Sequence, residues 1–456
     1  MTFLHIKPIA WAYSTISLGT GMLNSVFSFY YVKLFLQVYK IPEAAFCQAQ
    51  IILMVWNVLN NLVGNFYFNF KADCSLSDPL FILLGAFLYV VAFLLPWFPW
   101  RQYREDDWLS ELHLVASLCT FESTLIYVQQ ALRSLLVEIS TRRESRLQMV
   151  KINQVPLLVG STSILFCGLI SNNMENLPNF QVAAVFVAFL AAANLCIGVY
   201  HMRHLEPKIS PEENLCLESE QDAVWTSVIL LMRRMLSQKK FHLFLIVNFF
   251  QVFHLTVFNN FMMIFADTLI PGDVFSSSMR SIMYGAGFIC SQCLVFIIWP
   301  WLKKYGYYKI ILISFYLEGA ASIVMLILGQ EYYYSLALYL IIIVATVQAS
   351  SCLLNLPLAD MVDTDLLKFN RQSPSSSVVF GFNALFTKPA QSLASVVILL
   401  CLEQYDFGNP NSSVLLELQD FMFCLICLVP LGIAIIQILV WNEFSVRNKK
   451  YQMQSL

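Results

Sequence analysis

The stretch VVFGFNALFTKPAQSLASVVILL, Val378 to Leu400, is long enough to cross a lipid bilayer and has one charged residue, Lys388, near its middle. A lysine at the centre of a lipid-facing helix costs about 2.5 to 3.5 kcal/mol even on lenient insertion scales, so such residues nearly always face a protein interior or a water-filled cavity. The alternative is a lysine that snorkels to the membrane surface, which the mid-span position and the neighbouring Pro389 disfavour. Lys388 therefore predicts a polar interior in a membrane protein.

Composition extends the membrane assignment to the whole chain. Hydrophobic residues make up 58% of the 456 residues, charged residues make up 12%, and the mean hydropathy is +0.66. This balance leaves too little polar surface to coat a soluble globule. The net charge of -2 provides no basic excess for phosphates. We therefore expect a lipid bilayer around the chain and no nucleic-acid partner.

The cysteines indicate no metal site, cofactor or disulfide framework. Two CxxC pairs, Cys290/Cys293 and Cys424/Cys427, fall inside apolar runs, without the further Cys or His ligands that zinc requires. We interpret them as buried thiols.

Apolar runs of about 20 residues predict an all-α membrane protein with twelve transmembrane helices. These runs are 9–37, 43–69, 79–99, 110–137, 152–172, 179–201, 241–266, 278–301, 308–329, 332–357, 377–402 and 419–442. One separator is long and polar. We therefore predict an N-terminal six-helix half, 1–201, a cytoplasmic linker, 202–240, and a C-terminal six-helix half, 241–456.

The basic residues predict the orientation. If the N-terminus is cytoplasmic, twenty of the 27 lysines and arginines lie in inside segments, four lie outside, and Lys33, Arg133 and Lys388 lie within spans. Both termini should then be cytoplasmic. The only N-x-[ST] sequon, at Asn411, falls on the predicted outer side, so we expect it to be glycosylated.

Polar residues recur on one face of several predicted spans. The first span has Ser17, Gly21, Asn24 and Ser28, the second has Asn57, Asn60, Asn61, Gly64, Asn65 and Asn69, and the seventh has Gln251, His254 and Asn260. For any one stripe, helix packing and the lining of a cavity both remain open. Several stripes in two six-helix halves favour a cavity. His254 has no second His or acidic residue at a metal-ligand spacing, which favours packing over metal binding.

The segment ADMVDTDLLKFNR contains three aspartates without the spacing, glycine and distal glutamate of a calcium loop. One interpretation is a cytoplasmic gate of ion pairs with basic loops, and the other is an ordinary solvated loop. The gate would consist of Arg142, Arg143, Asp360, Asp363, Asp365 and Arg371.

Four segments resemble a known family. They are FSFYYVKLF (27–35), WNVLNN (56–61), QVFHLTVFNNF (251–261) and ADMVDTDLLKFNRQSPSSSVVFGFNALFTKPAQ (359–391). With twelve spans in two halves, they resemble the major facilitator superfamily. The closer resemblance is to its melibiose-permease-like branch of glycoside-pentoside-hexuronide:cation symporters, and within it to the transmembrane protein 180 family. This implies the major facilitator fold, with Lys388 at a central cavity near the cation and substrate sites.

The sequence also departs from this branch. Cation-coupled members have carboxylates where this chain has Asn57, Asn61 and Gln129, and the first span lacks an acidic residue. The loop after the second span, GNFYFNFK, lacks the superfamily's Asp-Arg pair. Glu122 and Glu318 are the buried carboxylates left for proton coupling, and neither matches a family cation ligand. We therefore expect a carboxylate-free, electropositive cavity and uniport or exchange that is indifferent to Na+.

Two functions follow. The first is a monomeric plasma-membrane transporter, not an enzyme, that moves a small organic solute by alternating access. The solute would be sugar-like, or a lysolipid or other anionic amphiphile, and Asn24, Asn57, Asn61, Gln129, His254, Asn260 and Lys388 would line its cavity. The alternative is a transport-deficient relative that acts as a membrane scaffold or receptor.

Overall fold

The computed structural model describes residues 8–70, 79–103, 107–139, 143–205, 233, 236–368, 376–403, 405 and 412–454, and the regular structure within these ranges is entirely helical. The prediction of an all-α fold is confirmed for this part of the chain. The N-terminal helices are α1 (Pro8–Lys33), which continues into a π-helical turn (Leu34–Val38), α2 (Glu43–Phe70), α3 (Pro79–Leu94), α4 (Trp108–Ile139), α5 (Arg143–Ser171) and α6 (Leu177–Leu205).

The C-terminal helices are α8 (Lys239–Leu269), α9 (Ser277–Tyr305), α10 (Tyr307–Leu328), α11 (Tyr333–Leu353), α12 (Asn355–Lys368), α13 (Ser376–Glu403) and α14 (Ser412–Gln454). Each predicted span falls on a helix, and α12 is a further helix that the sequence analysis did not separate. Pro357 lies in the first turn of α12, where a missing N–H leaves no intrahelical bond unmade, so a new helix can start there.

Eight segments of the described chain are long and apolar enough to cross a membrane, and they lie on α5, α6, α8, α9, α10, α11 with α12, α13 and α14. The apolar segment Leu83–Trp97 is shorter. The predicted spans on α1, α2 and α4 contain amides and hydroxyls that lower their hydropathy. The total of twelve spans therefore stays a prediction.

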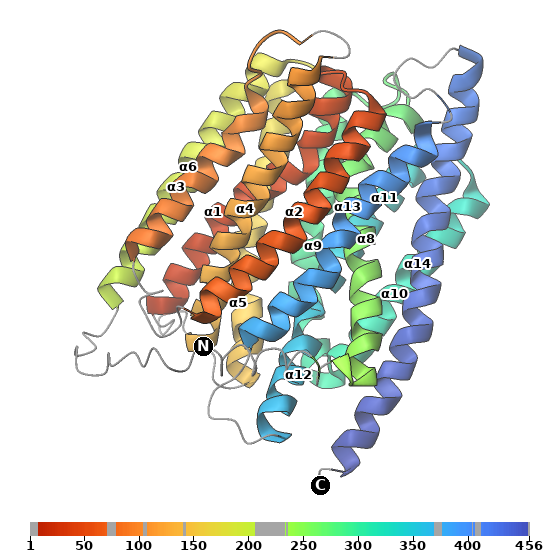
Figure 1. Ribbon diagram of the computed structural model, residues 1–456. Coiled ribbons are helices and arrows are strands. Elements are labelled where there is room, and N and C mark those ends of the chain that lie inside the picture. Colours follow the sequence, from red (N-terminus) through yellow and green to blue (C-terminus); the bar gives the residue numbers. More distant parts are fainter. Residues whose placement is uncertain are drawn as a thin grey trace.

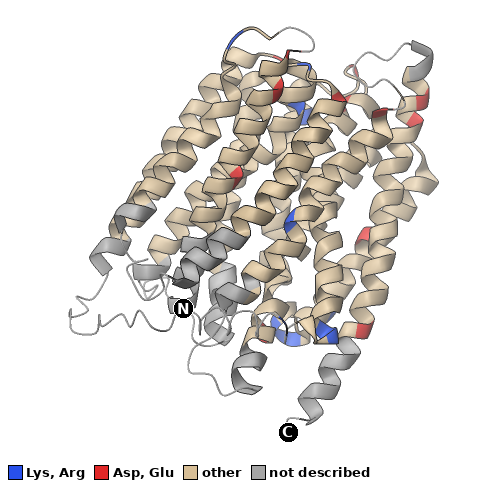
Figure 2. Ribbon diagram, viewed as in Figure 1, with Lys and Arg blue, Asp and Glu red and all other residues tan. Residues whose placement is uncertain are grey.

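Outward-facing side chains show which surface meets lipid. Val182 and Phe189 on α6, Ile327 on α10 and Leu439 on α14 are each at least two-thirds exposed. Large apolar side chains in such numbers are stable against hydrocarbon and not against water. Charged residues gather at the two ends of the bundle, with few between them (Figure 2). The protein is thus a multi-pass membrane protein.

The helices pack in two groups that also contact each other. Among the N-terminal helices α1 packs on α5 and α6, and among the C-terminal helices α8 packs on α11, α13 and α14. Contacts between the groups join α2 with α13, α5 with α9, α1 with α8, and α4 with α13 (Figure 1). The start of α1 and the end of α14 lie at the same end of the bundle, the lower end in Figure 1. The assignment of this end to the cytoplasm stays a prediction.

Small residues let α1 and α6 approach closely. A Cβ atom on Gly19 would lie 2.8 Å from the carbonyl oxygen of Ala191 and 2.8 Å from Cγ of Leu195. A Cβ atom on Gly198 would lie 2.5 Å from Cγ1 of Ile16. Close backbone approach of this kind maximises dispersion contacts between helices that gain little from the hydrophobic effect in lipid.

We expect Gly19→Ala to destabilise the protein by about 1 to 3 kcal/mol, because the added methyl group meets a backbone carbonyl that cannot rotate away. Thermal unfolding of the purified protein in detergent measures the change. Gly432→Ala on α14 is the matched control, since no atom lies within 4 Å of a Cβ atom built there. Equal midpoints for the two variants would contradict the close packing of α1 on α6.

Candidate functional site

Lys388 forms an ion pair between the two groups of helices. Its ammonium on α13 lies 2.7 Å from Oε2 of Glu122 on α4. Gln391, one turn along α13, closes the cluster: its Oε1 accepts from Lys388 at 3.2 Å, and its Nε2 donates to Oε1 of Glu122 at 3.0 Å. We call Lys388, Glu122 and Gln391 the central cluster.

The central cluster lies far from both membrane surfaces. Glu122 and Lys388 each lie near the midpoint of their helix, and their side chains are only 5% and 17% exposed. Phe27 of α1 stacks on Phe121, with ring centroids 3.6 Å apart. Glu122 also interacts electrostatically with the buried Tyr31 hydroxyl. Lys388 thus faces protein and does not snorkel.

The Lys388–Glu122 pair corrects the expectation of a carboxylate-free centre and explains how a lysine is tolerated in the middle of the membrane. A carboxylate, that of Glu122, lies 2.7 Å from the Lys388 ammonium and balances its charge. The expectation of an electropositive centre was therefore wrong. A protonated lysine at this depth is stable because its counter-charge and its amide partner replace the water that it loses.

The predicted amides of α2 lie inside the bundle. Asn57 is 0% exposed and Asn61 is 2% exposed. The Asn61 amide donates to the Asn57 carbonyl at 2.8 Å, whereas both polar atoms of the Asn57 side chain have no hydrogen-bond partner. An unpaired buried amide costs free energy unless a ligand satisfies it.

The other predicted cavity residues separate into different environments. Asn260 on α8 donates to the Tyr31 hydroxyl of α1 at 2.9 Å and lies 3.3 Å from Oγ of Ser395 on α13. His254 contacts Glu318, away from the central cluster. Asn24 and Gln129 are half-buried, and within the described chain neither is hydrogen-bonded to Lys388.

A second polar network joins the helix groups at the upper end in Figure 1. Asp267 near the end of α8 accepts from Lys33 of α1 at 2.7 Å and from Arg280 of α9 at 2.7 Å. The Tyr284 hydroxyl donates to the same carboxylate at 3.1 Å. We call these four residues the upper network. This network was not predicted from the sequence, although a charge at the end of an apolar run, as at Lys33 and Asp267, is the signal that indicates such a cluster.

The predicted lower gate is only partly described. The Tyr307 hydroxyl donates to Asp360, so this carboxylate contacts another C-terminal helix. Arg142 and Arg371 lie outside the described residues, as does Asn411. Arg143 on α5 and Asp363 and Asp365 on α12 have helical backbones, but their side chains are not among those described. The ion-pair gate and the glycosylation of Asn411 stay predictions.

A surface hollow of about 750 Å³ also opens at the upper end, lined by Val38, Tyr39, Lys40, Pro99, Arg101, Gln102, Tyr103 and Leu177. Burial raises the pKa of Tyr103, so its hydroxyl stays protonated and donates to Nδ1 of His113 at 2.9 Å. The Arg101 guanidinium already binds Asp107, at 2.6 Å. The hollow lies within the N-terminal part of the fold, so it does not connect the two groups of helices.

Comparison with known proteins identifies the family. The family model described as MFS/sugar transport protein matches residues 12–446. The chain belongs to this family. The resemblance drawn from the sequence is confirmed, because the chain is 26% identical to transmembrane protein 180 of Gallus gallus, over 98% of this chain and 94% of that one. It is 24% identical to the Mus musculus protein of that name, over 97% and 93%.

Solved structures agree on the fold of this family member. The nucleoside transporter NupG superposes with a TM-score of 0.59 at 14% identity, covering 97% of this chain and 99% of that one. A mutant of the same transporter gives a TM-score of 0.60 at 15% identity, covering 96% and 99%. The protein therefore has the fold of a major facilitator transporter.

We expect Lys388→Met alone and Glu122→Gln alone each to destabilise the protein, by roughly 3 kcal/mol, because each leaves an unpaired charge at mid-membrane. The double variant should recover most of this loss, since no buried charge remains. Thermal unfolding of the four proteins completes a double-mutant cycle. Additive effects would show that the two charges do not depend on each other.

Proposed function

We propose that this protein is a membrane transporter that moves a small organic solute by alternating access, with the central cluster at its centre. The observation that supports it most is the Lys388–Glu122 pair, which joins α13 to α4 in the middle of the bundle. Charges at this depth are expensive and are typical of substrate or ion pathways. Because this ion pair joins the two groups of helices, movement of one group relative to the other would break it and form it again.

The upper network would close one side of this pathway. Lys33 belongs to the N-terminal helices, whereas Asp267 and Arg280 belong to the C-terminal helices. Opening the upper end would break the Lys33–Asp267 contact and leave Asp267 paired with Arg280. The carboxylate would therefore keep a counter-charge in both states, which keeps the cost of opening small. The gate predicted from the sequence, which includes Arg142, Arg143 and Asp360, would close the lower side.

The charges of the central cluster favour a zwitterionic solute. Lys388 offers an ammonium group and Glu122 a carboxylate, so an anionic and a cationic group on one molecule would replace the charge that each residue loses. A simple anion would leave Glu122 unpaired. The unpartnered Asn57 amide would add neutral hydrogen bonds. This favours the zwitterionic head group of a lysolipid over a neutral sugar.

We propose that the chain crosses the plasma membrane twelve times as a monomer, in two six-helix halves, 1–201 and 241–456, joined by a cytoplasmic linker, 202–240. The excess of lysine and arginine in the segments that the sequence places on the same side as the termini supports cytoplasmic termini.

A scaffold or receptor function is the second candidate. Its support is that Asn57, Asn61 and Gln129 are neutral where cation-coupled relatives have carboxylates. It differs from the first candidate in a measurable way, because a scaffold needs no solute.

Binding of a solute is tested by thermal unfolding of the purified protein against lysolipids, zwitterions, amphiphilic anions and sugars. A solute at about 100 times its Kd stabilises a protein by about 2.7 kcal/mol. We expect a zwitterion to do so, and both Lys388→Ala and Glu122→Gln to abolish the effect. The exposed Lys303→Ala is the matched control and should keep it. If anions bind more tightly to the Glu122→Gln variant than to the wild type, the proposal of a zwitterionic solute is wrong. If no class of compound stabilises the protein, the scaffold or receptor function is favoured.

Transport should be indifferent to Na+. A dehydrated Na+ ion prefers anionic oxygens, and the amides Asn57, Asn61 and Gln129 offer only neutral ones. With the zwitterion found above, uptake into proteoliposomes should proceed at the same initial rate with and without an inward Na+ gradient. Accumulation driven by that gradient would contradict this prediction.

A further inference from the structure

A second pair of titratable groups lies inside the C-terminal helices. His254 is at the midpoint of α8, Glu318 is close to the midpoint of α10, and both side chains are 0% exposed. Neither takes part in the central cluster or the upper network. A buried imidazole and a buried carboxylate at the same depth of a membrane protein are costly, and helix packing alone does not require them.

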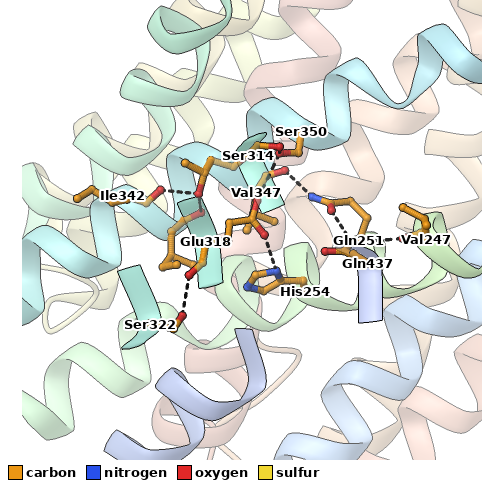
Figure 3. Close-up of polar contacts among 12 residues, drawn as sticks. Val247, Gln251, His254, Ser314, Glu318, Ser322, Ile342, Val347, Ser350 and Gln437 are labelled. Atoms are coloured by element: carbon orange, nitrogen blue, oxygen red, sulfur yellow. Dashed lines mark hydrogen bonds and ion pairs between the residues drawn. The ribbon is translucent and has the colours of Figure 1, made fainter. Parts of the chain in front are cut away.

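The geometry of the pair leaves hydrogen-bonding capacity unused (Figure 3). Nδ1 of His254 lies 3.4 Å from Oε2 of Glu318, which is long for a charge-assisted hydrogen bond. Neither imidazole nitrogen has a hydrogen-bond partner, and neither does Oε2. Oε1 lies 3.4 Å from Oγ of Ser350, which in turn lies 2.8 Å from Oγ of Ser314 on the half-buried side of α10.

The neighbours of the pair supply no compensating charge. The Phe258 ring packs against the imidazole, with centroids 5.3 Å apart. The titratable groups that face the pair are Tyr339 on α11, which interacts electrostatically with Glu318, and Cys427 on α14 beside Tyr339. Within the described chain no lysine or arginine contacts either member; Lys388 on α13 is held by Glu122 and Gln391.

Two glutamines complete the surroundings. Gln251 donates to the Val347 carbonyl at 2.8 Å, and Gln437 of α14 donates to Gln251 at 2.8 Å (Figure 3). These bonds brace α8 against α11 and α14 next to His254. They are neutral, so they do not change the charge of the pair.

Charge balance therefore decides how many protons the pair holds. Without a bound proton it is neutral imidazole beside a carboxylate, with a net charge of -1 and no counter-ion. With one proton, on either residue, it is neutral overall. A net charge in a low-dielectric interior is strongly disfavoured, and two coupled groups of this kind titrate as a unit.

We propose that His254 and Glu318 form a proton-binding site that controls the position of α8. In the packing seen here the pair holds one proton, and its release leaves a buried anion that separates His254 from Glu318, shifts α8 against α11 and α14, and admits water. The same helix reaches the N-terminal helices through Asn260, bonded to Tyr31, and Asp267, bonded to Lys33. Movement of α8 would therefore loosen both contacts with α1.

For a transporter, this site would link proton release to opening at the upper end. The link to transport rests on the function proposed above, whereas the proton site itself does not. It would lie among the C-terminal helices, and not at the family's cation position at Asn57, Asn61 and Gln129. Proton coupling would then have moved to another position in the fold.

Hydrogen–deuterium exchange of the full-length protein in lipid nanodiscs tests the proposal without any solute. As the pH is raised, and after correction for the intrinsic exchange rate, the opening constant of upper α1 and α8 should rise by up to about tenfold per pH unit, the slope for one linked proton. Glu318→Gln mimics the protonated carboxyl and should abolish the rise. The exposed Glu331→Gln is the matched control and should keep it.

A flat wild-type profile, or the same rise in Glu318→Gln, would overturn the proposal. If Glu318→Gln does not fold, infrared difference spectroscopy of the wild-type protein decides the proposal by itself. Infrared difference spectroscopy of the wild-type protein needs no variant. Raising the pH should remove either the C=O band of a protonated carboxyl or the ring bands of a protonated imidazole, and the absence of both changes counts against the site. If the proton site is confirmed but the protein binds no solute, the proposed transporter function is refuted and the proton site stands.

Discussion

The cost of placing charge in the middle of a membrane shapes the interior of this protein. Hydrocarbon supplies no partner for an ammonium or a carboxylate, so each charge must find one inside the bundle. Lys388 finds Glu122 across the interface between the two groups of helices, and His254 finds Glu318 within one group. The first pair depends on how the groups are positioned, whereas the second depends on how α8 and α10 each pack on α11 and α14. The two pairs therefore depend on different parts of the packing.

Helix α8 connects these features. Along its length it has His254 against α10, Asn260 against α1 and α13, and Asp267 against α1 and α9. The intrahelical hydrogen bonds of α8 keep the spacing between these positions constant. Contacts within the C-terminal helices and contacts with α1 therefore lie on one helix. The Gly19 contact between α1 and α6 gives α1 a firm support on its other side.

The expectation of an electropositive centre failed for a specific reason. Lys388 and Glu122 are 266 residues apart in sequence, and the helical periodicity of α4 does not show which neighbour its face will meet. Glu122 was recognised as a buried carboxylate, but its partner depends on the packing of α4 against α13. In the same way, the spacing of His254 gave no acidic neighbour along its own helix, and Glu318 came from another helix.

The sequence by itself determined that this is an all-α membrane protein of the MFS/sugar transport protein family, and it placed a helix at every predicted span. These properties follow from composition, from apolar runs and from short motifs, each of which is local along the chain. It also identified Lys388, Glu122, His254 and Glu318 as residues too polar for their positions. Only the tertiary structure decided which of them pair, that the upper network joins Lys33 to Asp267 and Arg280, and that Asn57 has an unpartnered amide. Pairing is a property of distances between helices, which are set by side-chain packing and close glycine contacts and are not encoded at any single position.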